Sequence, residues 1–144
     1  MSGHPRVIGY LQRAVSHEFG AAQQFTLQAV LAESWNLPTL ATELRTGARE
    51  ELEHAEAFIG HLVRLGITPG VSQPRLPPVG HSHAELLQYG LVTEMAAMRL
   101  YEEAAQFCSR TGDSVHYALF TRILGDEKQH LQELEHRLQA LGTG

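Results

Sequence analysis

Residues 51 to 54 read Glu51-Leu52-Glu53-His54, and residues 127 to 130 read Glu127-Lys128-Gln129-His130. Both stretches are Glu-x-x-His motifs. A further glutamate stands 33 residues upstream of each motif, Glu18 before the first and Glu94 before the second. One offset of 76 residues therefore relates the two sets of carboxylates and imidazoles.

Each of the four repeated glutamates stands in an apolar pattern of helical period. Apolar residues recur at steps of three and four on both sides of it, which places them on one helix face with the glutamate at the centre. We predict a single domain, 1–144, with helices over about 5–34, 39–65, 83–111 and 114–141. The residues expected on the buried stripes are Leu11, Ala14, Ala22, Phe25, Ala29, Leu44, Ala48, Ala55, Phe58, Leu62, Leu65, Leu87, Leu91, Met98, Tyr101, Ala105, Phe120, Leu124, Leu131, Leu134, Leu138 and Leu141.

The breaks between the predicted helices differ in length. Residues 35–38 and 111–114 are short breaks, which favour antiparallel neighbours. Residues 66–82 form a long connection that contains four prolines and is therefore not helical. An extended chain of this length spans roughly 55 Å, whereas a helix of about 26 residues is roughly 39 Å long. The second and third helices can thus run parallel, so we predict an all-α four-helix bundle with one long crossover.

Local signals mark the helix ends. Pro5 suits the first turn of a helix, and Gly66 suits a helix C-cap. The stretch from Ser82 to Glu85 is a capping-box pattern that opens the third helix.

Composition excludes several classes of protein. The formal net charge of −5 and the lack of a Lys/Arg stripe disfavour nucleic-acid binding. Cys108 is the only cysteine, which excludes an intrachain disulfide and a cysteine-based zinc cluster. We find no apolar run long enough for a membrane span and no signal-like N-terminus, and therefore expect a cytoplasmic protein.

Four glutamates on core-facing stripes would be costly as bare ions. Each must be protonated, paired with a cation, or neutralised by metal, and the stripes supply no Lys or Arg. Glu and His three residues apart point to one side of a helix. Two Glu-x-x-His helices and two single-Glu helices are the ligand set of di-iron and dimanganese bundles. A single motif occurs by chance on many exposed helices, but the repeat favours a metal site formed by Glu18, Glu51, His54, Glu94, Glu127 and His130.

The other histidines are expected at the surface, although His61, one heptad after His54, could touch the end of the bundle. They are His4, His17, His61, His81, His83, His116 and His136.

At these residues the sequence resembles bacterioferritin and, more broadly, the ferritin-like superfamily. The similarity covers nearly the whole chain and is strongest at residues 10–14, 18–24, 50–56 and 126–130. The resemblance implies a ferritin-like bundle with a ferroxidase centre, in which O₂ or peroxide oxidises two Fe²⁺ per subunit. The implied ligand roles are two terminal sets and one bridging pair: Glu18 with His54, Glu94 with His130, and Glu51 with Glu127. Glu50 and Asp126 would accept hydrogen bonds from the ligand histidines, or else lie on solvated helix faces.

The sequence departs from the bacterioferritin pattern at the haem position. Bacterioferritins carry a methionine directly after the first bridging glutamate, and it binds haem at a two-fold interface. This chain has Leu52 there, so no haem is expected. Met95 and Met98 are expected to be core residues rather than replacement ligands.

Two further departures concern a tyrosine and the chain end. A tyrosine often found near the di-iron site is Phe25 here, and its counterpart in the repeat is Tyr101. We predict that the Tyr101 hydroxyl hydrogen-bonds a ligand carboxylate instead. The chain stops at Gly144, without the fifth helix of many bacterioferritins, so the expected homo-oligomer ranges from a dimer to a cage.

Three functions remain open from the sequence. The first is a ferroxidase that oxidises iron for uptake, storage or detoxification. The second is a di-iron or dimanganese redox enzyme for peroxide or a small organic substrate, which needs a pocket that Ala22, Phe25, Ala97 and Met98 could shape. The third, a structural subunit of a mixed cage, is disfavoured because all six ligands are present.

Overall fold

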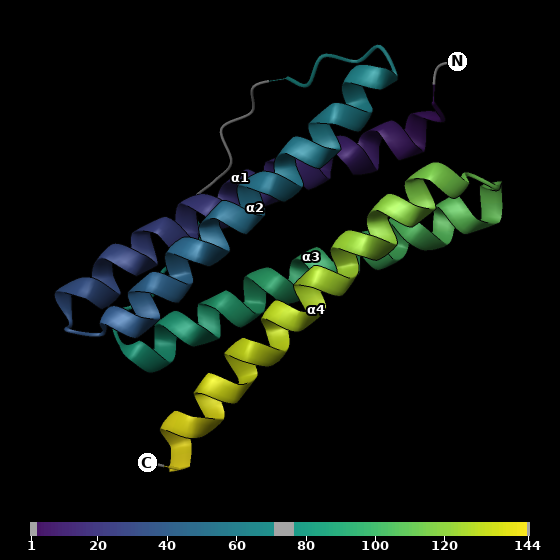
Figure 1. Cartoon of the computed structure of the whole chain (residues 1–144). Helices are drawn as coiled ribbons and strands as arrows, with labels where there is room; N and C mark the ends of the chain where they lie inside the picture. Colours follow the sequence, from purple (N-terminus) through teal and green to yellow (C-terminus); the bar gives the residue numbers. More distant parts are fainter. Residues whose placement is uncertain (1–2, 71–76, 144) are drawn as a thin grey trace.

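The computed structural model describes residues 3–70 and 77–143, which fold as long α-helices joined by loops (Figure 1). The helices are α1 (Pro5–Ser34), α2 (Pro38–Arg64), α3 (His83–Thr111) and α4 (Ser114–Thr143). Each begins and ends within two residues of its predicted boundary, and the all-α class is confirmed. The middle of the crossover, with Pro74, and the chain end at Gly144 lie outside the described residues. None of the described helices is long and apolar enough to cross a membrane.

The four helices form two antiparallel hairpins that face each other (Figure 1). α1 pairs with α2, and α3 pairs with α4. α2 and α3 run in the same direction, as expected for helices joined by a long crossover (Figure 1). The predicted bundle with one long crossover is therefore confirmed.

Local hydrogen bonds explain where the helices begin and end. The Ser82 side chain accepts a hydrogen bond from the Glu85 N–H at 3.2 Å. The Glu85 carboxylate accepts one at 3.0 Å from the N–H of His81, the residue before the cap. After α2, Gly66 has a left-handed φ of 79° and donates its N–H to Val63 O at 2.9 Å. These bonds satisfy backbone groups that helix termini leave without partners.

The apolar core is divided into two clusters along the bundle. The first contains Phe58, Tyr101 and Phe120 and joins all four helices. The second contains Ala29, Leu44 and other buried residues of α1, α2 and α3, with only partly buried leucines from α4. In sequence, each of the four repeated glutamates falls between the residues that its helix gives to the two clusters. The chain therefore places a layer of carboxylates across the middle of an apolar bundle.

The predicted stripe of α4 is wrong at its end. Leu141 is exposed, and Leu131, Leu134 and Leu138 are only partly buried. Figure 1 shows the last turns of α4 projecting away from the α1–α2 hairpin. The apolar spacing continues there, but the bundle offers little surface to pack against.

Replacing Ser82 by alanine should remove the cap of α3 and lower the free energy of unfolding by about 1 kcal/mol. The melting temperature should fall by roughly 2–5 °C, measured by circular dichroism on the metal-free protein. Ser109→Ala, an exposed change within α3, is the matched control and should leave the melting temperature nearly unchanged. An equal loss in both variants would contradict the capping role of Ser82.

Candidate metal centre

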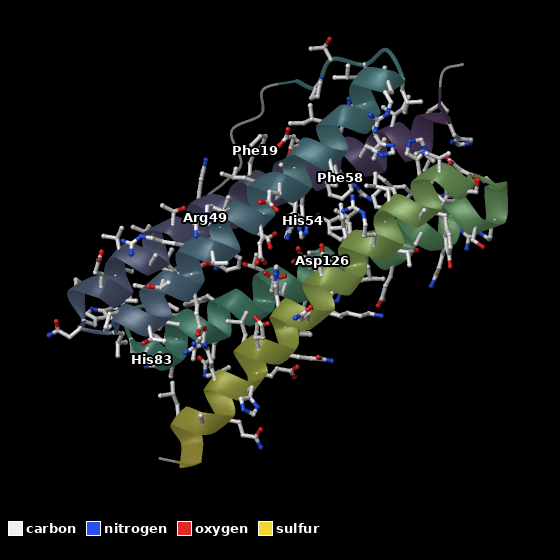
Figure 2. All side chains as sticks on the ribbon, viewed as in Figure 1. Phe19, Arg49, His54, Phe58, His83 and Asp126 are labelled. Atoms are coloured by element: carbon white, nitrogen blue, oxygen red, sulfur yellow. The ribbon has the colours of Figure 1, made fainter. Side chains whose placement is uncertain are left out.

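The layer of carboxylates brings the six predicted ligands together from all four helices. Its four glutamates are at most 1% exposed, and each comes from a different helix. His54 and Asp126 meet in the middle of the bundle, where α2 faces α4 (Figure 2). The six residues are Glu18 on α1, Glu51 and His54 on α2, Glu94 on α3, and Glu127 and His130 on α4.

The six side chains form two overlapping groups. In each group the potential ligand atoms all lie within 4.8 Å of one another. Glu51 and Glu127 belong to both groups, so they lie between two positions that an ion could take. The first group is Glu18, Glu51, His54 and Glu127, and the second is Glu51, Glu94, Glu127 and His130.

Each histidine is oriented by a carboxylate of the opposite hairpin. His54 Nε2 lies 2.9 Å from Asp126 Oδ2, and His130 Nε2 contacts Glu50 Oε2. In a neutral imidazole whose Nε2 hydrogen is donated to that carboxylate, Nδ1 presents its lone pair to the buried glutamates. His54 Nδ1 lies 2.9 Å from a Glu127 oxygen. Glu50 and Asp126 thus stand where acceptors for the histidines were expected.

Tyr101 completes one side of the cluster. Its hydroxyl donates a hydrogen bond of 2.5 Å to Glu18 Oε1, as predicted from the sequence. The ring is fully buried and packs against Phe58, with 5.3 Å between ring centroids. Burial and the Glu18 carboxylate raise the pKa of Tyr101 well above its usual range, so the hydroxyl keeps its proton and acts as a donor.

Several buried atoms of this cluster have no hydrogen-bond partner among the described residues. Buried polar atoms are rarely left without a partner, because each costs about 1–3 kcal/mol. All of the atoms concerned face the same small volume and all can ligate a cation. They are Glu18 Oε2, both carboxylate oxygens of Glu51, His54 Nδ1, Glu94 Oε2 and both carboxylate oxygens of Glu127. The donor set therefore fits metal ions held between the helices.

The electrostatics of the metal-free cluster distribute protons unevenly. Burial disfavours the charged form of His54, but Glu127 and Glu18 outweigh it and raise its pKa to about 10. Burial and the nearby charge of Glu18 hold the pKa of Glu51 well above its usual range. Burial opposes ionisation of Glu18 too, yet interactions with Glu51, His54 and Tyr101 lower its pKa. Without metal, these shifts favour the imidazolium form of His54 and the protonated form of Glu51.

One surface assignment and one core assignment made from the sequence need correction. His116 is 7% exposed, because its ring packs 5.1 Å from that of His61 at the end of the bundle. Its Nδ1 lies 2.8 Å from Asp113 Oδ2, which satisfies the buried nitrogen. Met95, expected in the core, is 43% exposed on α3, whereas Met98 is partly buried against the core.

A network that the sequence analysis missed connects α1 to α3 beside the cluster. Thr93, next to Glu94, donates a hydrogen bond of 2.6 Å to the side chain of Gln24. The carbonyl of Thr93 lies 3.2 Å from Nε2 of His17, next to Glu18. The signal available in the sequence was the helical spacing of Gln24 and Thr93 among apolar residues. It was not decisive, because glutamine and threonine are mostly found on exposed faces.

A cleft of about 850 Å³ between α2 and α4 leads to one side of the cluster. Its wall includes Phe25, Leu44 and Leu134, and it reaches Glu94 and His130. Of the four residues predicted to shape a pocket, Phe25 alone lines this cleft. The other three, Ala22, Ala97 and Met98, lie on α1 and α3, whereas the opening lies mainly between α2 and α4.

Comparison with known proteins places this fold and cluster in one class. Residues 8–143 match the family described as the ferritin-like domain. In bundles of this class, glutamates and Glu-x-x-His motifs project inward to hold two metal ions. The bundle described above and its two groups of potential ligands have this arrangement.

The similar proteins narrow the class further. The bacterioferritin of Brucella melitensis is 32% identical over 141 residues, 98% of this chain and 88% of that protein. The bacterioferritin of Rhodobacter capsulatus is 31% identical, over 94% of this chain and 84% of that protein. A solved structure of Rhodobacter capsulatus bacterioferritin, with a metal-free dinuclear site and a haem iron, superposes with a TM-score of 0.96. That comparison has 29% identity and covers 99% of this chain and 89% of that one. The chain therefore belongs to the bacterioferritin family of ferritin-like proteins, which confirms the resemblance seen in its motifs.

Metal binding should release protons and become tighter as pH rises. His54 must lose its proton before Nδ1 can ligate, and Glu51 must ionise. Below the pKa of His54, affinity should rise by about ten- to one hundredfold per pH unit, for one or two displaced protons. Calorimetric titration with Co²⁺ in buffers of different ionisation enthalpy measures the number of protons released. An affinity that stays constant from pH 6 to 8 would contradict these pKa shifts.

Proposed function

We propose that this protein is a ferroxidase that binds two irons per subunit and oxidises Fe²⁺ to Fe³⁺ for iron uptake, storage or detoxification. The observation that carries the proposal is the pair of ligand groups that share Glu51 and Glu127. Two cations at neighbouring positions repel each other, so anionic groups between them are needed. The two shared carboxylates supply these groups. The relatives named bacterioferritin support iron as the metal.

The proposed ligand roles follow from which side chains belong to one group and which to both. Glu18 and His54 would hold the first ion, Glu94 and His130 would hold the second, and Glu51 and Glu127 would be shared by both. Four ionised glutamates balance the charge of two divalent ions, which offsets the cost of burying those carboxylates. Carboxylate oxygens with one imidazole per ion suit both iron and manganese.

The surrounding residues of this chain prepare the site for oxidation of its substrate. Each Fe²⁺ that becomes Fe³⁺ gives one electron to O₂ or peroxide. Asp126 and Glu50 hold the imidazole rings in place, so the ligands need little rearrangement. Tyr101 holds Glu18 in one orientation and contributes a proton donor beside the first ion position. The carboxylates favour the trivalent product, because its greater charge interacts more strongly with them.

We also propose that the protein binds no haem in the manner of its haem-containing relatives. Leu52 is 47% exposed on α2, and a leucine side chain has no atom that can ligate iron. Purified protein incubated with haem should show no Soret band after gel filtration, and Leu52→Met should acquire one. A Soret band in the unmodified protein that Leu52→Ala leaves unchanged would contradict the proposal.

Aerobic titration with Fe²⁺ tests the ferroxidase assignment. Rapid oxidation should saturate at about two irons per subunit, and Glu51→Ala and His130→Ala should each slow it by at least about tenfold. Glu53→Ala, an exposed change within the same motif, is the matched control and should oxidise iron at the original rate. Unchanged rates in both ligand variants would disprove the assignment. Size-exclusion mass measured on the same samples gives the homo-oligomer, and storage requires far more iron per particle than the site itself holds.

A further inference from the structure

The two proposed metal positions are equivalent in the sequence repeat but have different surroundings. We propose that they exchange metal at different rates: the Glu94–His130 position exchanges divalent cations through the α2–α4 cleft, and the Glu18–His54 position retains its ion. This inference rests on the proposed dimetal function and adds a direction of entry and release. It follows from which ligands the cleft reaches.

Only one ligand pair lines the cleft. Glu94 and His130 form part of its wall, with Glu50 beside them, whereas Glu18 and His54 do not. The side chain of His130 is 17% exposed and that of His54 is 8% exposed. An ion at the Glu94–His130 position can therefore meet solvent without passing the other ion.

The 76-residue repeat explains why the opposite half has no such cleft. Leu44, Gly47 and Leu134 line the cleft. Their counterparts in the repeat are larger and wholly buried, and fill the corresponding space in the first core cluster. These counterparts are Phe120 for Leu44, Ile123 for Gly47 and Phe58 for Leu134. Phe58 and Phe120 pack together with 5.6 Å between ring centroids.

The aromatic residue beside each position differs as well. Tyr101 donates a hydrogen bond to Glu18, which restrains that carboxylate. Its counterpart Phe25 lines the cleft and has no hydroxyl to offer Glu94. A ligand that is free to move can leave its ion more easily. The missing hydroxyl therefore favours faster exchange at the Glu94–His130 position, as does the smaller apolar packing on that side.

The entrance of the cleft suits a cation. Glu43 and Arg137 form an ion pair across it, from α2 to α4, and so neutralise each other. Glu50 and Glu133 also line the cleft and leave an excess of negative charge there. Such an excess raises the local concentration of divalent cations.

The test follows metal release from protein loaded with Co²⁺, whose visible absorption reports its coordination. After addition of excess EDTA, the absorption should decay in two phases of equal amplitude, with rates that differ by about tenfold or more. The double variant Gly47→Ile/Leu134→Phe carries the residues of the closed half. It should slow the fast phase by about tenfold and leave the slow phase unchanged. Within 4 Å, a Cβ at position 47 meets only Phe25, at 3.9 Å, so the first atom of the new side chain fits.

The reciprocal change gives a second, independent measurement. Phe58→Leu places the residue of the open half beside the Glu18–His54 position and should accelerate the slow phase. Gly9→Ile, at a position of α1 where a Cβ meets nothing within 4 Å, is the matched control. Its two phases should remain as in the unmodified protein.

The possible outcomes separate this inference from the proposed function. Binding of fewer than two Co²⁺ per subunit would overturn the dimetal assignment and this inference with it. Two bound ions that leave in a single phase would overturn the inference alone. If Gly47→Ile/Leu134→Phe fails to fold, as judged by circular dichroism, a slow phase that Phe58→Leu leaves unchanged would overturn it.

Discussion

The structure depends on a layer of four carboxylates buried in the middle of an apolar bundle. Each unpaired carboxylate in such surroundings costs several kcal/mol, and an apolar residue of similar size would cost nothing comparable. The chain nevertheless places one glutamate at the centre of every helix, between two apolar clusters. A local conflict of this kind, inside a fold whose other choices agree with one another, is characteristic of a functional site.

The same layer determines how the two hairpins fit together. Across the interface between α2 and α4, each Glu-x-x-His histidine reaches a carboxylate on the opposite hairpin. Across the interface between α1 and α3, the Tyr101 hydroxyl binds Glu18, and Thr93 binds Gln24. Polar contacts have strict geometry, so they specify one register of the hairpins, whereas apolar faces alone would tolerate several. The site and the assembly of the bundle are therefore coupled.

The repeat produces a site that is symmetric in its ligands and asymmetric in its walls. One half is closed by large buried rings, including Phe58 and Phe120, and the other is lined by smaller residues such as Gly47. Under the proposed function, the symmetric ligand groups would let two ions share Glu51 and Glu127. The asymmetric walls leave Glu94 and His130 on the cleft, whereas Glu18 and His54 do not line it. The proposed exchange of one ion and retention of the other would then belong to different halves of one bundle.

The sequence by itself determined the four helices, the crossover and the six candidate ligands, because helical periodicity places Glu18 and its counterparts on buried stripes. It also predicted the bond from Tyr101 to a candidate ligand carboxylate. The family resemblance places a tyrosine near the site, and the repeat shows which position exchanges tyrosine for phenylalanine. Only the tertiary structure decided where the bundle ends and where it opens. Leu141 continues an apolar stripe but is 40% exposed, and His116 is buried because another helix brings His61 against it. The cleft lies between helices that are far apart in the chain, and the space left between two surfaces depends on how both pack, which periodicity along either helix does not contain.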